Sequence, residues 1–360
     1  PSRGALSGRL IVGEAALPAQ PRVSLLLPNY NNGPVLDTHL EKLHQHTTYP
    51  DFELIAADDG SSDDSLDVLR RWRDSGRFAN FTLLECERRG IIVTLDEILR
   101  HATGEVMVKI DGDATVQTPG WVEKMLAFMR SDERVGIVQA KIVFDSGRVH
   151  SYGVNVVCPE GFHDRGCSIT EPIGRRKALG RIERPMEEDS EGGDRVAEVD
   201  AALSCWTMMR ADLVRELGGW DPAYYPVWYE DIDFAFAART RGRKVFFFPD
   251  VRVIHHIAKR APRVGQSAWK TALFAANRRF GHLVPQRLKD IVSETTPLGD
   301  RDPAKLQIIE RHRAHWREKW GFDPVNPDVD YILERYRGTE VCWAYDPELK
   351  AAGEEIAARA

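Results

Sequence analysis

Two aspartates separated by a single glycine follow a short apolar run in the first third of the chain. In EVMVKIDGDATV (105–116), apolar residues alternate as on one face of a strand, and Asp111 and Asp113 come directly after them. Carboxylate oxygens are the ligands that Mg²⁺ and Mn²⁺ prefer in proteins. Aspartate is also common in turns, and the chain holds three other Asp-x-Asp pairs. The spacing by itself therefore leaves a turn and a functional site both open.

Two further polar clusters follow apolar runs in the same way. Residues 28–31 (Pro-Asn-Tyr-Asn) end the run 22–28, and residues 58–61 (Asp-Asp-Gly-Ser) end the run 52–60. In open parallel sheets, ligands bind at the carboxyl ends of the strands. Three polar clusters at three such ends predict a binding site at one edge of a sheet.

Elements that could position these clusters alternate along the first part of the chain. Strands are predicted at 22–28, 52–60, 81–85 and 105–110, and helices at 34–47, 61–75 and 92–102. This alternation is typical of a doubly wound α/β domain. The helix at 61–75 offers the alternative that residues 58–64 (DDGSSDD) only cap it, through Ser61 or Ser62.

The remaining chain is more varied. Residues 135–157 predict strands and a hairpin, 202–221 a strand and a helix stopped by two glycines, and 227–256 an acidic helix start, an amphipathic helix and two strands. Residues 170–197 are charged, rich in glycine and without periodicity, which predicts a loop that becomes ordered over substrate or a disordered insertion. Helices are predicted at 267–283 and 302–321.

Composition limits the class of protein. Of 360 residues, 42% are hydrophobic and 29% charged, which is ordinary for a soluble globular protein. A net charge of −6 argues against nucleic acid as the main partner. No apolar stretch is long enough for a transmembrane segment, and no signal peptide pattern is present. Five widely spread cysteines indicate reduced thiols and a cytoplasmic location.

Five motifs occur in an order that resembles family 2 glycosyltransferases of the GT-A fold, in the bacterial branch that includes rhamnosyltransferase-like enzymes. They are VSLLLPNYNN, ADDGSSDD, VMVKIDGD, GGWDPAYYPVWYEDIDFAFAARTRG and PDVRVIHH. The resemblance implies a mixed, Rossmann-like sheet flanked by helices over residues 21–258, with halves at 21–115 and 116–258. An N-terminal extension (1–20) and a mainly helical C-terminal region (259–360) complete the expected organisation.

The resemblance also implies an activity, which is inverting transfer of a sugar from a UDP-, dTDP- or GDP-linked donor to an acceptor hydroxyl. The acceptor would be a polysaccharide, a glycolipid or a natural product. Mn²⁺ or Mg²⁺ would be the cofactor, held by Asp111, Asp113 and a histidine after the last core strand. Because strand residues alternate in direction, only one of His255 and His256 should face the site, and we expect His255.

Other roles follow from the same resemblance. The residues expected to bind the nucleotide sugar are Pro28, Asn29, Tyr30, Asp58, Asp59, Asp111, Gly112 and Asp113. In the motif YEDIDF, Asp231 is the expected catalytic base, Glu230 would orient the acceptor, and Asp233 is placed nearer a helix cap. Aromatic residues that could stack on the acceptor, or equally belong to the core, are Trp206, Tyr225, Trp228 and Tyr229.

Two alternative functions are a nucleotidyltransferase and a catalytically inactive sugar-nucleotide-binding protein. The first would usually carry a basic, glycine-rich loop after its first strand, and PNYNNGPV contains no lysine or arginine. Retention of Asp111, Asp113 and Asp231 together argues against the second. A peripheral membrane contact and a homo-oligomer are both compatible with the sequence.

Overall fold

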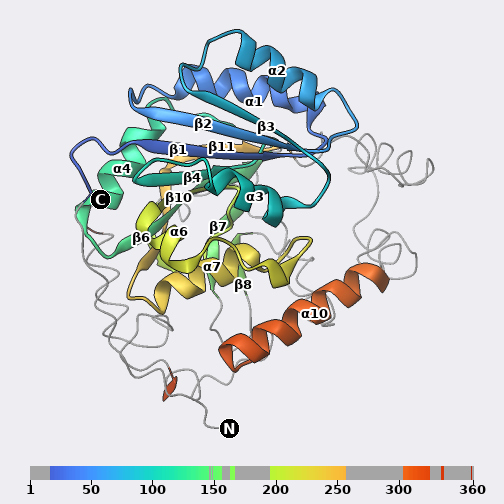
Figure 1. Ribbon diagram of the computed structural model, residues 1–360. Coiled ribbons are helices and arrows are strands. Elements are labelled where there is room, and N and C mark those ends of the chain that lie inside the picture. Colours follow the sequence, from blue (N-terminus) through green and yellow to red (C-terminus); the bar gives the residue numbers. More distant parts are fainter. Residues whose placement is uncertain are drawn as a thin grey trace, which may run out of the picture.

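The structure is a computed structural model that describes residues 17–145, 147, 149–155, 163–166, 195–256, 303–324, 334, 335 and 358. Its centre is a sheet of 11 strands, eight of which lie in the order β3-β2-β1-β4-β10-β6-β11-β5, while β7, β8 and β9 pair beside this row. Helices pack on both faces of the sheet (Figure 1). Strand β7 (Val149–Asn155) extends the sheet beside β6, and β8 (His163–Gly166) pairs with β7. This mixed sheet flanked by helices confirms the predicted fold class.

The N-terminal half is a run of parallel strands. It contains β1 (Val23–Asn29), β2 (Phe52–Asp59), β3 (Phe81–Cys86) and β4 (Val106–Ile110), connected by α1 (Gly33–His46), α2 (Ser65–Asp74) and α3 (Ile91–Leu99). Every residue of β1 and β4 is buried, as expected for central parallel strands covered on both faces. The predicted alternation of strands and helices is confirmed here.

The second half brings antiparallel strands into the sheet. Strand β10 (Trp206–Arg210) runs antiparallel to β4 on one side and to β6 (Val135–Phe144) on the other. Beyond β6 lie β11 (Lys244–His255) and β5 (Ala114–Val116), and β9 (Ala197–Val199) also pairs with β11. Helix α4 (Trp121–Ser131) packs against β6 and β11, and α6 (Ala211–Leu217) follows β10 and ends at Gly218, which has a left-handed conformation.

One predicted boundary is wrong. The sequence predicts two strands after the helix within residues 227–256, but β11 is a single strand whose pairing with β6 shifts register between Phe248 and Arg252. Pro249 and Asp250 lie at this shift, where a proline that cannot donate to the ladder is tolerated as a bulge. The strand therefore continues to His255.

Helix α7 (Glu230–Arg239) is buried on nearly all sides, in contrast to the predicted amphipathic pattern. One side faces β6 and β11, and another faces α10 (Pro303–Trp320), which lies far along the chain (Figure 1). Phe236 of α7 packs against Trp316 and Trp320 of α10, with ring centroids 5.5 and 4.8 Å apart. A second packed partner leaves α7 without a solvent face.

Asp233 attaches α10 to α7. Its carboxylate accepts hydrogen bonds from Lys319 Nζ (2.6 Å), Trp320 Nε1 (2.7 Å) and the hydroxyl of Tyr224 (3.0 Å). Lys319 also donates to Asp221, 2.7 Å away, in the segment before the 3₁₀ turn η2 (Pro222–Tyr224). Asp233 thus lies in the first turn of α7, near the start of the helix as expected, but its side chain bonds α10 and Tyr224 and does not cap its own helix.

Within residues 58–64, neither Ser61 nor Ser62 caps α2. The residue before α2 is Asp64, whose side chain makes no capping bond, and the N–H of Ser65 is bonded by Asp63 (3.0 Å). The hydroxyl of Ser61 instead donates to Asp58 (2.6 Å) and accepts from the N–H of Asn31 (3.0 Å). The serines thus connect the ends of β1 and β2.

Removing the cation shared by Asp221 and Asp233 should weaken the attachment of α10. Lys319→Met leaves two carboxylates without their ammonium partner, and one of them is almost completely buried. Because the Lys319 side chain is 28% exposed, we expect a loss below that of a fully buried pair, about 1–3 kcal/mol in the free energy of unfolding. Urea unfolding measures this loss.

Lys124→Met, on the exposed face of α4, is the matched control and should change stability by less than about 0.5 kcal/mol. Equal effects of the two substitutions would contradict the assigned role of Lys319.

Candidate functional site

The three predicted polar clusters meet at one edge of the sheet. Asn29 at the end of β1 lies opposite Asp58 of β2 in the parallel register, and its amide donates to the Asp58 carboxylate (3.0 Å). Gly112, just beyond β4, lies so close to Asn29 that an added Cβ would come within 2.9 Å of its Oδ1. Glycine at position 112 therefore allows the loop after β4 to approach the loop after β1.

Asp58 and Asp59 are both buried, and their carboxylates organise the surrounding backbone. Asp58 accepts from the N–H of Ser61 (2.8 Å), and Asp59 accepts from the N–H groups of Arg89 (2.7 Å) and Gly90 (2.9 Å). Asp59 also forms an ion pair with Arg88. This pairing places a cation at the outer end of β2.

The guanidinium of Arg88 lies over the ring of Tyr30, 3.7 Å from the ring centroid. Tyr30 is half-buried, while Pro28 is fully enclosed within β1. A half-buried ring and an arginine at the carboxyl ends of two strands form a surface on which a planar base could stack. Pro28 is buried in β1, two residues before Tyr30.

His255 lies between the two aspartates of the DGD segment. Its Nε2 is 3.2 Å from Asp113 Oδ1 and 3.9 Å from Asp111 Oδ2. Asp113 is buried, whereas the side chain of Asp111 keeps 19% of its surface exposed. The last residue of β11 and the loop after β4 therefore supply one imidazole and two carboxylates to the same place.

His256 points to different partners. Its Nδ1 lies 2.6 Å from Asp145 and its Nε2 lies 2.8 Å from the hydroxyl of Thr115. The ring of His255, in contrast, has Nδ1 3.1 Å from Nδ1 of His150 on β7, so its Nε2 is left facing the aspartates. The two histidines thus diverge as strand alternation predicts.

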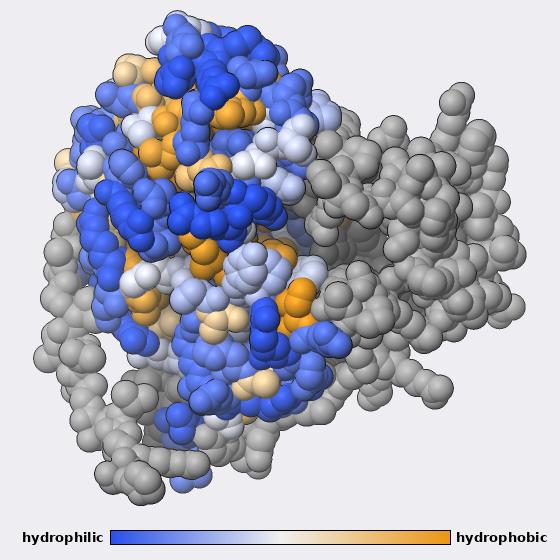
Figure 2. Space-filling view, turned by 45° about the vertical axis from the view of Figure 1, so that its right-hand side comes forward, coloured by the Kyte–Doolittle hydropathy of each residue, from blue (hydrophilic) through white to orange (hydrophobic). Residues whose placement is uncertain are grey.

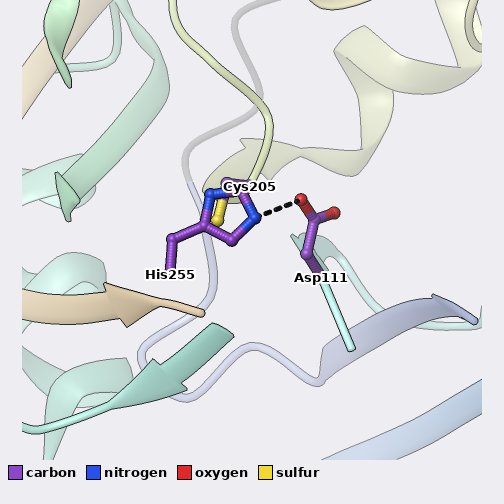
Figure 3. Close-up of side chains that lie close together, drawn as sticks. All are labelled: Asp111, Cys205 and His255. Carbon is purple, nitrogen blue, oxygen red and sulfur yellow. Dashed lines mark ion pairs between the residues drawn. The ribbon is translucent and has the colours of Figure 1, made fainter. Parts of the chain in front are cut away.

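Two residues at this site were missed by sequence reasoning. Lys109, buried in β4, forms an ion pair with Asp111. Burial would lower the pKa of Lys109, but the attraction of Asp111 outweighs it and raises the pKa. Cys205, just before β10, lies beside His255, with both side chains facing Asp111 (Figure 3).

Neither residue has a recognisable signal in the sequence. Lys109 lies within a strand and carries no motif of its own, and Cys205 is 94 positions from Asp111 along the chain. The pairing of β10 with β4 places Trp206 opposite Ile110, and the N–H of Asp111 donates to the carbonyl of Cys205 (3.0 Å). This pairing alone brings the thiol to the aspartate.

Glu230 and Asp231 begin α7 next to the segment that carries Ser204 and Cys205. Asp231 accepts from the N–H of Ser204 (3.2 Å), the neighbour of Cys205, and from the N–H of Ile232 (2.8 Å). Burial raises the pKa of Asp231 against these hydrogen bonds. For Glu230, burial and then the charge of Asp231 raise the pKa to about 8. Two adjacent acids of raised pKa at an edge already rich in polar groups are typical of a catalytic site.

The aromatic residues divide between core and surface. Trp206 has no exposed surface and packs against Trp121 (ring centroids 5.1 Å apart), and Tyr229 is 4% exposed and stacks on Tyr224. Both occupy core positions, which was the alternative that the sequence left open. Trp228 is half-buried, and Tyr225 is 47% exposed, the one large hydrophobic side chain exposed among the described residues.

Hydrophilic side chains cover most of the coloured part of the face seen in Figure 2, and apolar residues appear there as small separate patches. Among the described residues, no helix is both long and apolar enough to cross a membrane.

Of the segment 170–197, which was expected to order over substrate, residues 170–194 lie outside the described part of the chain. The predicted helix at 267–283 also lies outside it.

Residues 24–182 match the model of Glycosyl transferase family 2. The O-antigen biosynthesis protein RfbC of Myxococcus xanthus is 25% identical over 237 residues, which are 66% of this chain and 17% of that protein. Validoxylamine A glucosyltransferase of Streptomyces hygroscopicus subsp. limoneus is 27% identical over 236 residues, 62% of this chain and 49% of that protein. The chain thus spans between 17% and 52% of the length of these and two similar relatives.

Among solved structures, GalNAc-T7 with UDP, GalNAc and Mn²⁺ is similar in fold. The likeness has a TM-score of 0.51 at 16% identity and covers 88% of this chain and 56% of that one. This similarity supports the GT-A arrangement of a central mixed sheet flanked by helices. The family match ends before α7 and β11, so Asp231 and His255 are placed at the site by the structure and not by that match.

The raised pKa of Glu230 predicts a pH-dependent stability. With a pKa near 4.5 in the unfolded chain and about 8 in the folded protein, Glu230 contributes stability that is full below pH 4.5 and lost as the pH rises through 8. Glu230→Gln removes this dependence. The stability of the variant relative to the parent should therefore increase between about pH 5 and pH 8, by roughly 1–3 kcal/mol.

Urea unfolding of both proteins at the two pH values measures the difference. Glu216→Gln, an exposed glutamate on α6, should show no such pH-dependent difference. A constant difference between Glu230→Gln and the parent at both pH values would contradict the assignment.

Proposed function

Since the chain belongs to glycosyltransferase family 2, we propose that it transfers a sugar from a nucleotide-diphosphate sugar to an acceptor hydroxyl, with inversion and with a divalent cation as cofactor. The observation that carries the proposal is the convergence of Asp111, Asp113 and His255 beside Asp231 at the carboxyl ends of the parallel strands. This edge is where open α/β sheets bind their ligands.

The residues present fit a divalent cation. Two carboxylate oxygens lie 3.2 and 3.9 Å from the same imidazole nitrogen, and all three donors are of types that Mn²⁺ accepts. Among the described residues, only Asp111, Cys205 and His255 bring three donor atoms within 4.8 Å of one another, so Asp113 would have to move closer to share the ion. Asp111, Asp113 and His255 would hold the ion. When bound, it would stabilise the negative charge that develops on the diphosphate as the sugar leaves.

Residues of the N-terminal half would bind the nucleotide. Tyr30 and Arg88 supply a surface for the base, and Asn29, Asp58 and Asp59 supply amide and carboxylate groups next to it. Gly112 lets the loop that carries the aspartates lie close to this surface. A donor lying across the ends of β1, β2 and β4 would therefore place its diphosphate near Asp111.

Asp231 would take the proton from the attacking acceptor hydroxyl. Its carboxylate is held by two backbone N–H groups, which fix its orientation, and its raised pKa brings it nearer to that of an effective base at neutral pH. Inverting transfer needs one such base, and Glu230 beside it would orient the acceptor. The names of the two relatives concern O-antigen and validoxylamine A, so a polysaccharide, glycolipid or natural-product acceptor fits the proposal.

The metal dependence is tested first. We expect that chelation removes binding of a nucleoside diphosphate and sugar transfer, and that Mn²⁺ or Mg²⁺ restores both. Asp113→Asn and His255→Gln should each weaken Mn²⁺-dependent nucleotide binding by roughly 10–100-fold, the scale seen for groups that support a metal site. Calorimetry with UDP, dTDP and GDP measures it.

His256→Gln is the matched control, because His256 is bonded to Asp145 and Thr115 and faces away from the aspartates. A larger loss in this control than in His255→Gln would reassign the ligand. Full activity in chelator would rule out the metal-dependent mechanism.

The base is tested by Asp231→Asn, which keeps the shape of the side chain but cannot accept the proton. We expect nucleotide affinity within about threefold of the parent and a transfer rate lower by roughly a hundredfold or more. Product analysis with a panel of sugar nucleotides gives the rate. Near-parental transfer by Asp231→Asn together with an inactive Glu230→Gln would show that Glu230 is the base.

A further inference from the structure

The proposed metal centre contains a thiol in addition to oxygen and nitrogen donors. One donor atom each from Asp111, Cys205 and His255 lies within 4.8 Å of the other two, and no other such group of three occurs among the described residues. Figure 3 shows the sulfur of Cys205 beside the His255 ring, with Asp111 facing both. Cys205 is 5% exposed.

The position of the thiol is fixed by the sheet. Cys205 precedes β10, and its carbonyl accepts the N–H of Asp111 at 3.0 Å, directly after the pairing of Trp206 with Ile110. His255 ends β11, where it lies opposite Ala114 of β5. Three strand ends therefore present the three donors, and none of them depends on a flexible loop tip.

The donor set differs from that of a hard-ion site. Mg²⁺ and Mn²⁺ prefer oxygen, whereas a thiolate together with an imidazole selects Zn²⁺ and similar soft ions. Around a tetrahedral Zn²⁺, ligand atoms lie about 3.5 Å apart, so shifts of about an ångström would close the observed group onto one ion. Such shifts are within the range of side-chain rotations.

We infer that Asp111, Cys205 and His255 form a three-ligand site for a soft divalent ion of the Zn²⁺ class, within the centre proposed to use Mn²⁺ or Mg²⁺. On binding, the thiol of Cys205 would lose its proton to solvent, so that the thiolate and the Asp111 carboxylate place two negative charges against the two charges of the ion and the one of Lys109. A fourth coordination position stays open to water or ligand. The inference rests on the proposed function only in sharing Asp111 and His255 with it.

Lys109 is part of the same balance. Its ammonium pairs with Asp111 Oδ1, whereas Oδ2 of the same carboxylate is the oxygen turned toward His255. The carboxylate can therefore keep Lys109 on one oxygen and offer the other to an ion. The fixed charge of Lys109 weakens the attraction of the site for any added cation. The thiolate would therefore contribute much of the selectivity for a soft ion.

Cd²⁺ is the probe, because a thiolate bound to it gives an ultraviolet charge-transfer band that oxygen and nitrogen ligands do not give. The chain has five cysteines, so the combined variant Cys86→Ser, Cys158→Ser, Cys167→Ser and Cys342→Ser retains Cys205 as its single thiol. We expect this protein to show the band at one equivalent of Cd²⁺. Adding His255→Gln should weaken Cd²⁺ binding by roughly tenfold or more.

A second measurement uses single substitutions in the otherwise unchanged chain, which guards against misfolding of the combined variant. Cys205→Ser should weaken Zn²⁺ binding by roughly tenfold or more in calorimetry but change Mn²⁺ affinity by less than about threefold. Cys86→Ser, half-buried at the end of β3, is the matched control and should leave both affinities unchanged.

Two results would overturn the inference: no charge-transfer band in the single-thiol protein, or equal Zn²⁺ affinity in Cys205→Ser and the parent. These outcomes are independent of the proposed function. Sugar transfer with Mn²⁺ but without the Cd²⁺ band would refute the soft-ion site alone, and the band without any transfer would refute the proposed function alone.

Discussion

At the edge of the sheet where β4 ends, Asp113 and Glu230 have almost completely buried side chains, and Asp111 is only partly exposed. Carboxylates withdrawn from water are costly unless a cation or hydrogen-bond donors compensate them. Lys109 compensates Asp111, the imidazole of His255 faces both aspartates, and Glu230 retains its proton up to about pH 8. A divalent cation entering here would meet acids that folding has already gathered, which is the basis of the proposed metal dependence.

The pairing of β10 with β4 holds this edge together. An antiparallel strand between two parallel halves carries Ser204 and Cys205 to the end of β4, and the N–H of Ser204 in turn holds Asp231. A register shift of one residue would turn every side chain of β10 to the other face, taking the fully buried Trp206 away from Trp121, against which it packs. Packing of the core therefore maintains the relative position of the proposed metal ligands and the proposed base.

Helix α10, near the C-terminal end of the described chain, also contributes to the position of Glu230 and Asp231. Trp228 and Tyr229 have positive φ angles of 81° and 75°, a conformation that costs free energy for bulky side chains and persists only when surrounding contacts maintain it. Tyr229 packs against His312 and Trp316 of α10, and Asp233 binds Lys319 of the same helix. The strained segment leads directly into Glu230 and Asp231, so α10 helps to set where the two acids point.

Much of the fold could be predicted from local pattern. Because β1 and β4 are buried on both faces, each is a continuous apolar run in the sequence. Parallel strands of this kind have their carboxyl ends at the same edge of the sheet. The local pattern is therefore enough to place the clusters around Asn29, Asp58 and Asp111 at one edge. Alternation along a strand likewise separates His255 from His256. Prediction fails where a residue's partner is distant in the chain. The side-chain partners of Asp233 could not be predicted because Lys319 and Trp320 lie on α10, and the division of β11 is wrong because the sheet accommodates its proline as a bulge.

Sequence periodicity by itself determined which faces of the strands and helices are buried. It therefore also determined the order of these elements along the chain and the edge of the sheet at which polar groups gather. Only the tertiary structure decided that Lys109 pairs with Asp111, that Cys205 stands beside His255, and that Trp206 and Tyr229 belong to the core. The physical reason is that periodicity records only whether each residue of a helix or strand faces the core or the solvent. Strand pairing and helix docking instead depend on free energies summed over contacts between segments far apart in the chain.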